Sequence, residues 1–216
     1  MSSKFSRLDF IRYSALGASA MVLPSTITKA VAAPAKKKNE KEDFINLGFI
    51  GLGQQSLSLL SGMISVTDQV RVVAGADIYD IKRARFEKRV NDWYAEKGIK
   101  NKFTMYTYPE ELIADPNVDA VVIATPDHWH AAIAIAACKA GKDVYLEKPL
   151  TFTVYEGQRL IEAVRANNRI LQVGSMQRSM AEFIHAANVV REGKLGKIST
   201  IYAYAGEGPL PYTLET

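Results

Sequence analysis

The chain has 216 residues, of which 48% are hydrophobic, 23% charged and 9% aromatic, so wholesale disorder, a collagen-like repeat and a coiled-coil rod are excluded. Its single cysteine, Cys138, excludes an internal disulfide framework and any CxxC-type zinc or redox motif. The formal net charge of +4 comes from residues 1–38, which hold seven bases and one acid, whereas the rest holds 20 bases and 22 acids; no nucleic-acid partner is therefore expected.

Residues 1–35 predict an export signal, in which basic residues precede an apolar stretch and then small residues around Ala30 to Ala35. The apolar stretch, Ala15 to Leu23, is shorter than the roughly 20 residues of a membrane span, so no permanent span is expected. Residues 6–12 resemble a twin-arginine motif in which Leu8 replaces the second arginine, and both twin-arginine export and general secretion stay open. We expect an exported, periplasmic protein, the alternative being a cytoplasmic one with a basic tail; residues 36–43 are a polar linker.

The body of the chain begins with a short apolar run, residues 45–50, which predicts a strand. Leu57, Leu60 and Ile64 then recur at helical spacing. Residues 70–76 predict the second strand, and the charge-dense residues 81–97 predict a solvated helix ended by Gly98. Its inward face is expected to carry four side chains: Ile81, Ala84, Val90 and Trp93.

Two further strands are expected at residues 103–106 and 119–124, and the unbroken apolar run of the second suits a strand buried on both faces of a parallel sheet. Thr125 and Pro126 then open a helix, with Thr125 as its expected cap, which ends at Gly141.

The remaining elements expected are strands at 144–146 and 170–173, helices at about 154–167 and 181–192, and a strand at 198–204. Strands that alternate with helices imply right-handed crossovers, and so an α/β fold with a Rossmann-type doubly wound parallel sheet. We place this domain at residues 44–174, followed at 175–216 by a connecting helix and the first strand of a second, α+β domain.

A dinucleotide-binding turn is expected where the first strand ends. Gly51 and Gly53 permit a tight turn and a close approach of a diphosphate, at a helix start that Gln54 and Gln55 open. Ser56 takes the place of the third glycine of the common motif, and it is still small enough for helix–strand packing.

Asp77 ends the second strand and lies 24 residues after Gly53, near the roughly 20 expected for the acid that binds the adenosine ribose. A carboxylate there repels a 2′-phosphate, so NAD is the expected cofactor and NADP the lesser alternative. Lys82 and Arg83 lie nearby, and a role for Asp77 as an ordinary helix cap stays open.

Three more segments follow strands, at the sheet edge where such folds bind ligands: Thr125-Pro126-Asp127-His128-Trp129-His130, Glu147-Lys148-Pro149 and Gly174-Ser175-Met176-Gln177-Arg178. Together with the glycine turn, they resemble the glucose–fructose oxidoreductase/inositol dehydrogenase (Gfo/Idh/MocA) family over about residues 45–204.

The resemblance implies roles for individual residues. Lys148 is expected to reach the nicotinamide and the substrate hydroxyl and to act as the catalytic proton relay. Glu147 is expected to contact the nicotinamide ribose or to orient that lysine, and Pro149 to follow a cis bond. The cofactor is also expected to meet Thr125, Pro126 and His130.

Gln177 and Arg178 are candidates to line the cofactor or substrate cleft, although a surface salt bridge is an alternative for Arg178. No metal site is expected, because His128 and His130, two residues apart, point to different faces of a helix and no third ligand lies close by in the sequence. Trp129 is expected to pack against the protein, and Cys138 to be a small buried apolar residue.

Members of the family continue into a second domain that supplies an Asp-x-x-x-His pair. Histidine occurs here only at positions 128, 130 and 185, so we expect the chain to be the N-terminal part of a longer protein, able to bind cofactor with little or no turnover. The full-length form is expected to be a homo-oligomer.

The function that the resemblance implies is an NAD(P)-dependent oxidoreductase that moves a hydride between the nicotinamide and a sugar, cyclitol or related polyol. NAD-assisted glycoside cleavage on the same fold is one alternative, although a lysine in the Glu-Lys-Pro tripeptide favours the oxidoreductase. A non-catalytic nucleotide-binding module is the other.

Overall fold

The computed structural model describes residues 44–65 and 69–204, and the expected export signal and linker lie outside these residues. One sheet of six strands forms the centre, in the order β3-β2-β1-β4-β5-β6, and every neighbouring pair is parallel. The strands are β1 (Ile45–Ile50), β2 (Val70–Ala76), β3 (Thr104–Tyr106), β4 (Ala120–Ile123), β5 (Asp143–Leu146) and β6 (Leu171–Val173).

The strand order reverses beside β1, where the chain returns from β3 to place β4 on the other side. Ile50, the last residue of β1, pairs with Ala76 of β2 and with Ile123 of β4, so these three strands end together at one edge of the sheet. Such a reversal is the switch point at which doubly wound sheets bind ligands, outside the carboxyl ends of the strands. The expected α/β fold with a Rossmann-type sheet is confirmed.

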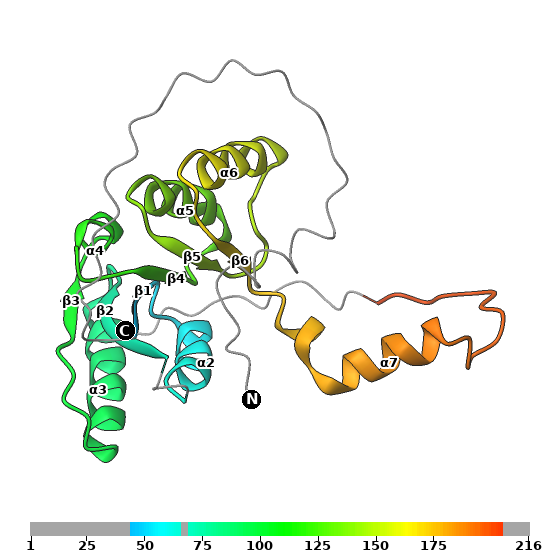
Figure 1. The fold of residues 1–216 in the computed structure, drawn as a ribbon, viewed down its shortest axis with the longest axis horizontal. Coiled ribbons are helices and arrows are strands. Elements are labelled where there is room, and N and C mark those ends of the chain that lie inside the picture. The colour runs from blue at the N-terminus through cyan, green and yellow to red at the C-terminus, as the bar shows by residue number, and fades with distance from the viewer. Residues whose placement is uncertain (1–43, 66–68, 205–216) are drawn as a thin grey trace, which may run out of the picture. The chain divides into compact units, whose positions relative to one another are not determined.

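Helices cover both faces of the sheet (Figure 1). The helices are α2 (Gln54–Met63), α3 (Asp80–Glu96), α4 (Pro109–Ala114), α5 (His130–Lys139), α6 (Val154–Ala166) and α7 (Ala181–Arg191). Helices α2 and α3 enclose one apolar core with Phe49 and Val72, and α4, α5 and α6 enclose a second core with Val121 and Leu146. Each strand of the centre therefore packs on both sides, which explains its nearly continuous apolar sequence.

The buried face of α3 differs from the expected one. Phe86, Val90 and Tyr94 are buried, whereas Ile81 is 52% exposed. Ala84 is also exposed, so of the four expected side chains only Val90 is fully buried. The stripe of residues four apart places two large aromatic rings inward, and Phe86 lies 5.2 Å from the ring of Phe49. The burial of these large aromatic side chains determines which face of α3 packs against the sheet.

Two further expectations are wrong. The segment after β4 begins as a 3₁₀ turn, Asp127–Trp129, and α5 starts only at His130, so Thr125 is not its cap. Residues 198–204 form no strand, and Ile201 and Tyr202 are 81% and 94% exposed. A strand needs a neighbour to accept and donate its backbone hydrogen bonds, and no strand of the described residues runs beside this segment.

Helix α7 has the apolar sequence of a packed helix, but none of its side chains is buried. Within residues 44–65 and 69–204, no helix is long and apolar enough to cross a membrane.

Candidate functional site

The two glycines of the turn after β1, Gly51 and Gly53, contribute to the site in different ways. Gly51 has a φ of +81°, and a Cβ there would lie 2.8 Å from the carbonyl oxygen of Ala124. Gly53 has ordinary extended dihedrals, but a Cβ on it would meet nothing within 4 Å. Gly51 is therefore needed by the fold, whereas Gly53 leaves open space in front of the turn.

The same turn leads into α2 with no side-chain cap at its N-cap residue, Gly53. The first N–H groups of a helix lack partners within the helix, and with the helix dipole they favour an anion. Ser56 is fully buried, and its hydroxyl donates a hydrogen bond to the carbonyl oxygen of Gly51. Ser56, which stands in place of the third glycine, therefore links α2 to the glycine turn through this hydrogen bond.

Asp77 extends from the end of β2 toward this turn. Its Oδ2 accepts a hydrogen bond from the N–H of Leu52 at 2.7 Å, and its Oδ1 accepts one from the N–H of Tyr79 at 2.9 Å. Tyr79, not Asp77, is the N-cap residue of α3. The carboxylate therefore lies beside the glycine turn, at the edge of the open space in front of Gly53.

Lys82 and Arg83, the two cations near Asp77, each have a partner in the protein. Arg83 Nη1 donates to the backbone oxygen of Asp77 at 2.6 Å, and Lys82 Nζ lies 4.7 Å from the centroid of the Tyr79 ring. Both partners belong to the turn from β2 into α3, so these side chains lie on that turn.

His130 is buried between two loops and does not face solvent. Its side chain is 1% exposed; Nδ1 lies 2.7 Å from the backbone oxygen of Pro149 and Nε2 lies 3.0 Å from that of Thr125. The ring connects the loop after β4 to the loop after β5. The cofactor contact expected for His130 stays a prediction, and the ring's contacts within the described residues are to these two backbone oxygens.

The rest of this loop is more open. Pro126 and His128 are exposed, and Trp129, for which packing was expected, is 54% exposed. Thr125 Oγ1 is buried without a hydrogen-bond partner in the described residues, and Thr125 Cγ2 would lie 2.8 Å from a Cβ on Gly51. The loop after β4 thus closes directly on the glycine turn, and it brings an unpaired hydroxyl to that point.

The Glu-Lys-Pro segment follows β5 at the same edge of the sheet, and the Lys148–Pro149 bond is cis, as the resemblance implies. Glu147 is only 4% exposed: its Oε1 accepts from Gln55 Nε2 at 3.0 Å, and its Oε2 accepts from the N–H of Lys148 at 3.2 Å. A buried carboxylate held by two donors from the protein is suited to orient Lys148, the second of the two roles expected for it.

Lys148 itself is exposed, and no described residue forms an ion pair or a side-chain hydrogen bond with its ammonium group. Gln177 and Arg178 lie in the 3₁₀ turn Met176–Ser179 after β6, and both are exposed. Arg178 has no ion pair with the described residues. The ammonium of Lys148, the amide of Gln177 and the guanidinium of Arg178 are thus available to a bound molecule.

Two residues near Glu147 were not singled out from the sequence. The Tyr145 hydroxyl donates a hydrogen bond to the Glu147 carboxylate, and a Cβ on Gly174 would lie 2.7 Å from Glu147 Oε1. Burial, and then the charge and hydrogen bond of Glu147, raise the pKa of Tyr145. The sequence did offer one signal: Tyr145 stands in an apolar strand two residues before Glu147, so the two side chains are expected on the same face of the strand.

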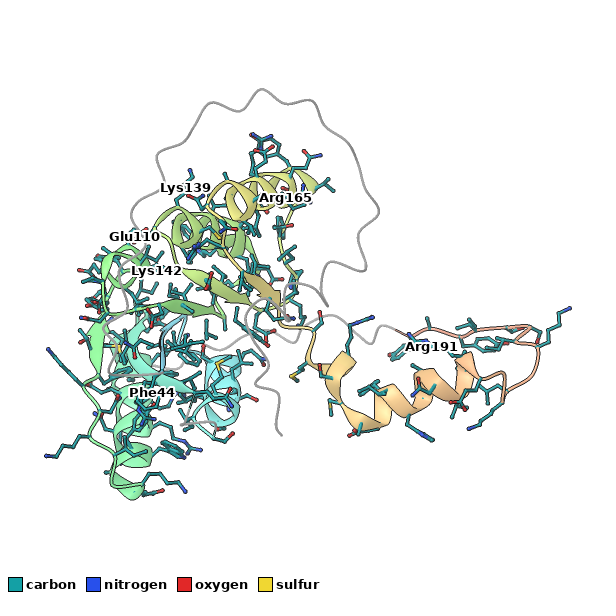
Figure 2. The ribbon with its side chains drawn as sticks, in the orientation of Figure 1. Phe44, Glu110, Lys139, Lys142, Arg165 and Arg191 are labelled. Carbon is teal, nitrogen blue, oxygen red and sulfur yellow. The ribbon has the colours of Figure 1, made fainter. Side chains whose placement is uncertain are left out.

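A separate cavity of about 680 Å³ lies at the opposite edge of the sheet, where the strands begin. Its lining includes Asn46, Arg71 and Asp115, and Phe44, which is labelled in Figure 2. The Arg71 guanidinium lies 4.1 Å from the centroid of the Phe44 ring. None of the motif residues lines this cavity, so the candidate site is the carboxyl edge.

No group of three or more histidine, cysteine, aspartate or glutamate side chains that could hold a metal lies within residues 44–65 and 69–204. The donors at the carboxyl edge are instead backbone N–H groups, hydroxyls and single charged groups. They fit a dinucleotide: an uncapped helix start for a diphosphate, and a carboxylate beside it for a ribose.

Comparison with known proteins agrees with this arrangement. The family model described as "Oxidoreductase family, NAD-binding Rossmann fold" matches residues 45–175. The chain is 32% identical over 153 residues to the myo-inositol 2-dehydrogenase of Thermotoga maritima, a match that covers 71% of this chain and 42% of that protein.

Two solved structures are similar in fold. A 3-ketoreductase variant from Actinomadura kijaniata, in complex with TDP-benzene and NADP, has a TM-score of 0.62 at 26% identity, over 71% of this chain and 44% of its own. The scyllo-inositol dehydrogenase of Lactobacillus casei, with bound NAD(H) and scyllo-inositol, has a TM-score of 0.58 at 22% identity, over 71% and 42%. The chain thus spans less than half the length of these relatives.

Proposed function

Because this chain belongs to the oxidoreductase family with an NAD-binding Rossmann fold, we propose that it is the nucleotide-binding part of a dehydrogenase that oxidises a sugar, cyclitol or related polyol. The observation that carries the proposal is the open space in front of Gly53, with the Asp77 carboxylate at its edge. A diphosphate needs such a bare turn at a helix start. The family match and the dehydrogenase relatives support the same activity.

The residues of the carboxyl edge take separate roles in this proposal. The N–H groups at the start of α2, with Gln54 and Gln55 beside them, hold the diphosphate. Asp77 accepts hydrogen bonds from the adenosine ribose, and the absence of a free cation beside it in the described turn favours NAD over NADP. Thr125, which lies directly against Gly51, and Pro126, which follows it in the same loop, border the nicotinamide end.

A bound nicotinamide supplies the hydride acceptor. Lys148 lies immediately before the cis bond to Pro149, and no described residue pairs with its side-chain nitrogen. In its neutral amine form this nitrogen takes the proton of the substrate hydroxyl as the carbon loses hydride. Gln177 and Arg178 hold substrate hydroxyls on the neighbouring turn. The substrate class comes from the relatives, two of which are named for inositol.

The glycine turn is tested with two matched substitutions in α2 and its cap. Gly53→Val fills the open space in front of the turn, and Gly62→Val adds the same side chain to a glycine of α2 that also has nothing within 4 Å. In calorimetric titrations of the chain, Gly53→Val should weaken NAD binding by at least about tenfold, because the valine occupies the approach of the diphosphate. Gly62→Val should bind NAD as the wild type does.

Equal NAD affinities of both variants would contradict the proposed cofactor site. The reaction is tested with the complete protein, NAD and a panel of polyols that carry deuterium at the carbinol carbon. Oxidation transfers the label to the reduced nicotinamide. Bond cleavage of a deuterated glycoside with the nicotinamide returned to its oxidised form would instead support NAD-assisted glycoside cleavage.

A further inference from the structure

Tyr145 has no role in the cofactor or substrate contacts proposed above, and yet its hydroxyl is bound to the most buried charge at the carboxyl edge. We propose that Tyr145 is a positioning residue: its hydroxyl and the Gln55 amide hold the Glu147 carboxylate as a buried brace that sets the position of Lys148. The inference rests on the proposed function for the role of Lys148, and on contacts within the chain for the brace itself.

The brace connects two segments that are distant in sequence, the start of α2 and the end of β5. Gln55 lies in the first turn of α2 and reaches Glu147 Oε1 at 3.0 Å. Tyr145 lies on β5, where it is fixed between Val122 of β4 and Gln172 of β6 by the register of the sheet. Since side chains two apart on an extended chain lie on one side, Tyr145 reaches the carboxylate of Glu147 without distortion.

Gly174, at the end of β6, completes the enclosure. A Cβ on Gly174 would lie 2.7 Å from Glu147 Oε1 and 3.0 Å from the Tyr145 hydroxyl oxygen. The carboxylate and the phenol therefore pack directly against the glycine backbone, and any larger residue there would displace them. The first turn of α2, the strand β5 and the end of β6 therefore meet at the Glu147 carboxylate.

The link from the brace to Lys148 is short. Glu147 Oε2 accepts the backbone N–H of Lys148 at 3.2 Å, immediately before the cis bond to Pro149. A carboxylate taken from water requires donors, and loss of one of them leaves it free to turn toward another. The phenol is suited to this role because burial and the nearby carboxylate raise the pKa of Tyr145, which keeps its proton on the donor.

The catalytic consequence is tested in the complete protein with Tyr145→Phe, which removes only the hydroxyl, and with Tyr155→Phe as the matched control on a side chain that is 66% exposed. With NAD and myo-inositol, Tyr145→Phe should lower kcat by about tenfold or more, because a misplaced reacting group slows the chemical step. The KM for NAD should change by less than about twofold. Tyr155→Phe should leave both constants unchanged.

A kcat of the wild-type value in Tyr145→Phe would overturn the positioning role. The brace itself is tested in the 216-residue chain by NMR of tyrosine labelled with ¹³C at Cζ, in which the Tyr145 resonance is the one missing from Tyr145→Phe. Glu147→Gln should lower the pKa of Tyr145, since it removes the neighbouring charge. The amide resonance of Lys148 should shift in both variants.

Failure of the proposed function and failure of the brace give different results. If the complete wild-type protein oxidises no polyol, the proposed function fails, and the NMR experiment decides the brace alone. If Tyr145 titrates identically in wild type and Glu147→Gln, and the Lys148 amide does not move, the brace does not exist, whatever the enzyme oxidises.

Discussion

His130 and Lys148 belong to two of the segments that carry the family resemblance, and the structure gives them opposite surroundings. His130 is 1% exposed, with both ring nitrogens beside backbone oxygens, whereas Lys148 is exposed and its ammonium has no partner among the residues that the structure describes. Both backbone oxygens are acceptors, so the neutral imidazole, with its single N–H, can donate to only one of them. A histidine of a motif can therefore join two loops of the site through backbone contacts, and the motif alone does not predict that its side chain is buried.

Asp77 carries the prediction on cofactor choice. Asp77→Ala removes the carboxylate that accepts the Leu52 N–H and that we assign to the ribose. We expect the affinity for NAD to fall by about tenfold to a hundredfold, because a hydrogen bond to a charged group contributes about 1.5–3 kcal/mol. Affinity for NADP should fall less or rise, since the repulsion of its 2′-phosphate is removed. Calorimetry with both cofactors measures the ratio.

Asp80→Ala is the control, because Asp80 is exposed in the first turn of α3 and its carboxylate accepts, among the described residues, from the neighbouring N–H of Ile81 alone. It should leave the ratio of the two affinities as in the wild type. If Asp77→Ala also leaves the ratio of the NAD and NADP affinities unchanged, Asp77 does not bind the adenosine ribose.

Lys142 connects the turn between α5 and β5 to the segment between α4 and β4. It lies between α5 and β5, is 8% exposed, and donates to the backbone oxygens of Asp115 at 2.7 Å and of Val118 at 2.6 Å. Those oxygens belong to the segment between α4 and β4, where carbonyls at a helix end lack partners within the helix. The ammonium therefore joins the two connections at the amino edge of the sheet.

Lys142→Met is expected to destabilise the chain by about 1–3 kcal/mol, because the buried carbonyl oxygen of Val118 loses this donor and that of Asp115 keeps only the Val118 N–H, at 3.3 Å. Lys139→Met is the matched control, since Lys139 is exposed near the end of α5; Figure 2 labels both lysines. Urea unfolding followed by circular dichroism gives both free energies of unfolding. Equal values for the two variants would show that Lys142 makes no net contribution.

Elements with a strong local signal could be predicted from the sequence. The ranges expected for β1 and β2 agree with the structure at both ends, because apolar runs between glycine and charged residues are sharply bounded. Helix α4 was missed, although Pro109 at its start, followed by Glu110 and Glu111, is a typical helix-start pattern. At six residues it is too short for an apolar period to appear.

At the scale of the whole molecule, the sheet separates two apolar cores. Ile64 belongs to the core beneath α2 and α3 and is 3% exposed, whereas Ile123 belongs to the core beneath α5 and α6 and is fully buried. The sheet is the only layer of the described residues that both cores share. Each core can therefore be perturbed separately by the loss of a single methylene group.

Ile64→Val and Ile123→Val are each expected to lower the free energy of unfolding by about 0.5–1.5 kcal/mol. The double variant should lose the sum of the two within about 0.5 kcal/mol, because residues on opposite faces share no side-chain partners. Urea denaturation of the four proteins tests this. An interaction energy above about 1 kcal/mol would mean that the sheet transmits strain between the cores.

The sequence by itself determined the doubly wound sheet, the place of the glycine turn and the candidate residues at the carboxyl edge, because apolar period, glycine positions and motif spacing are local properties. The tertiary structure alone decided which of those residues face outward: it buried His130, exposed Lys148, and brought Gln55, Tyr145 and Gly174 together around Glu147. These contacts join residues as many as 92 positions apart. Their geometry depends on how parallel strands align, which no short stretch of sequence encodes.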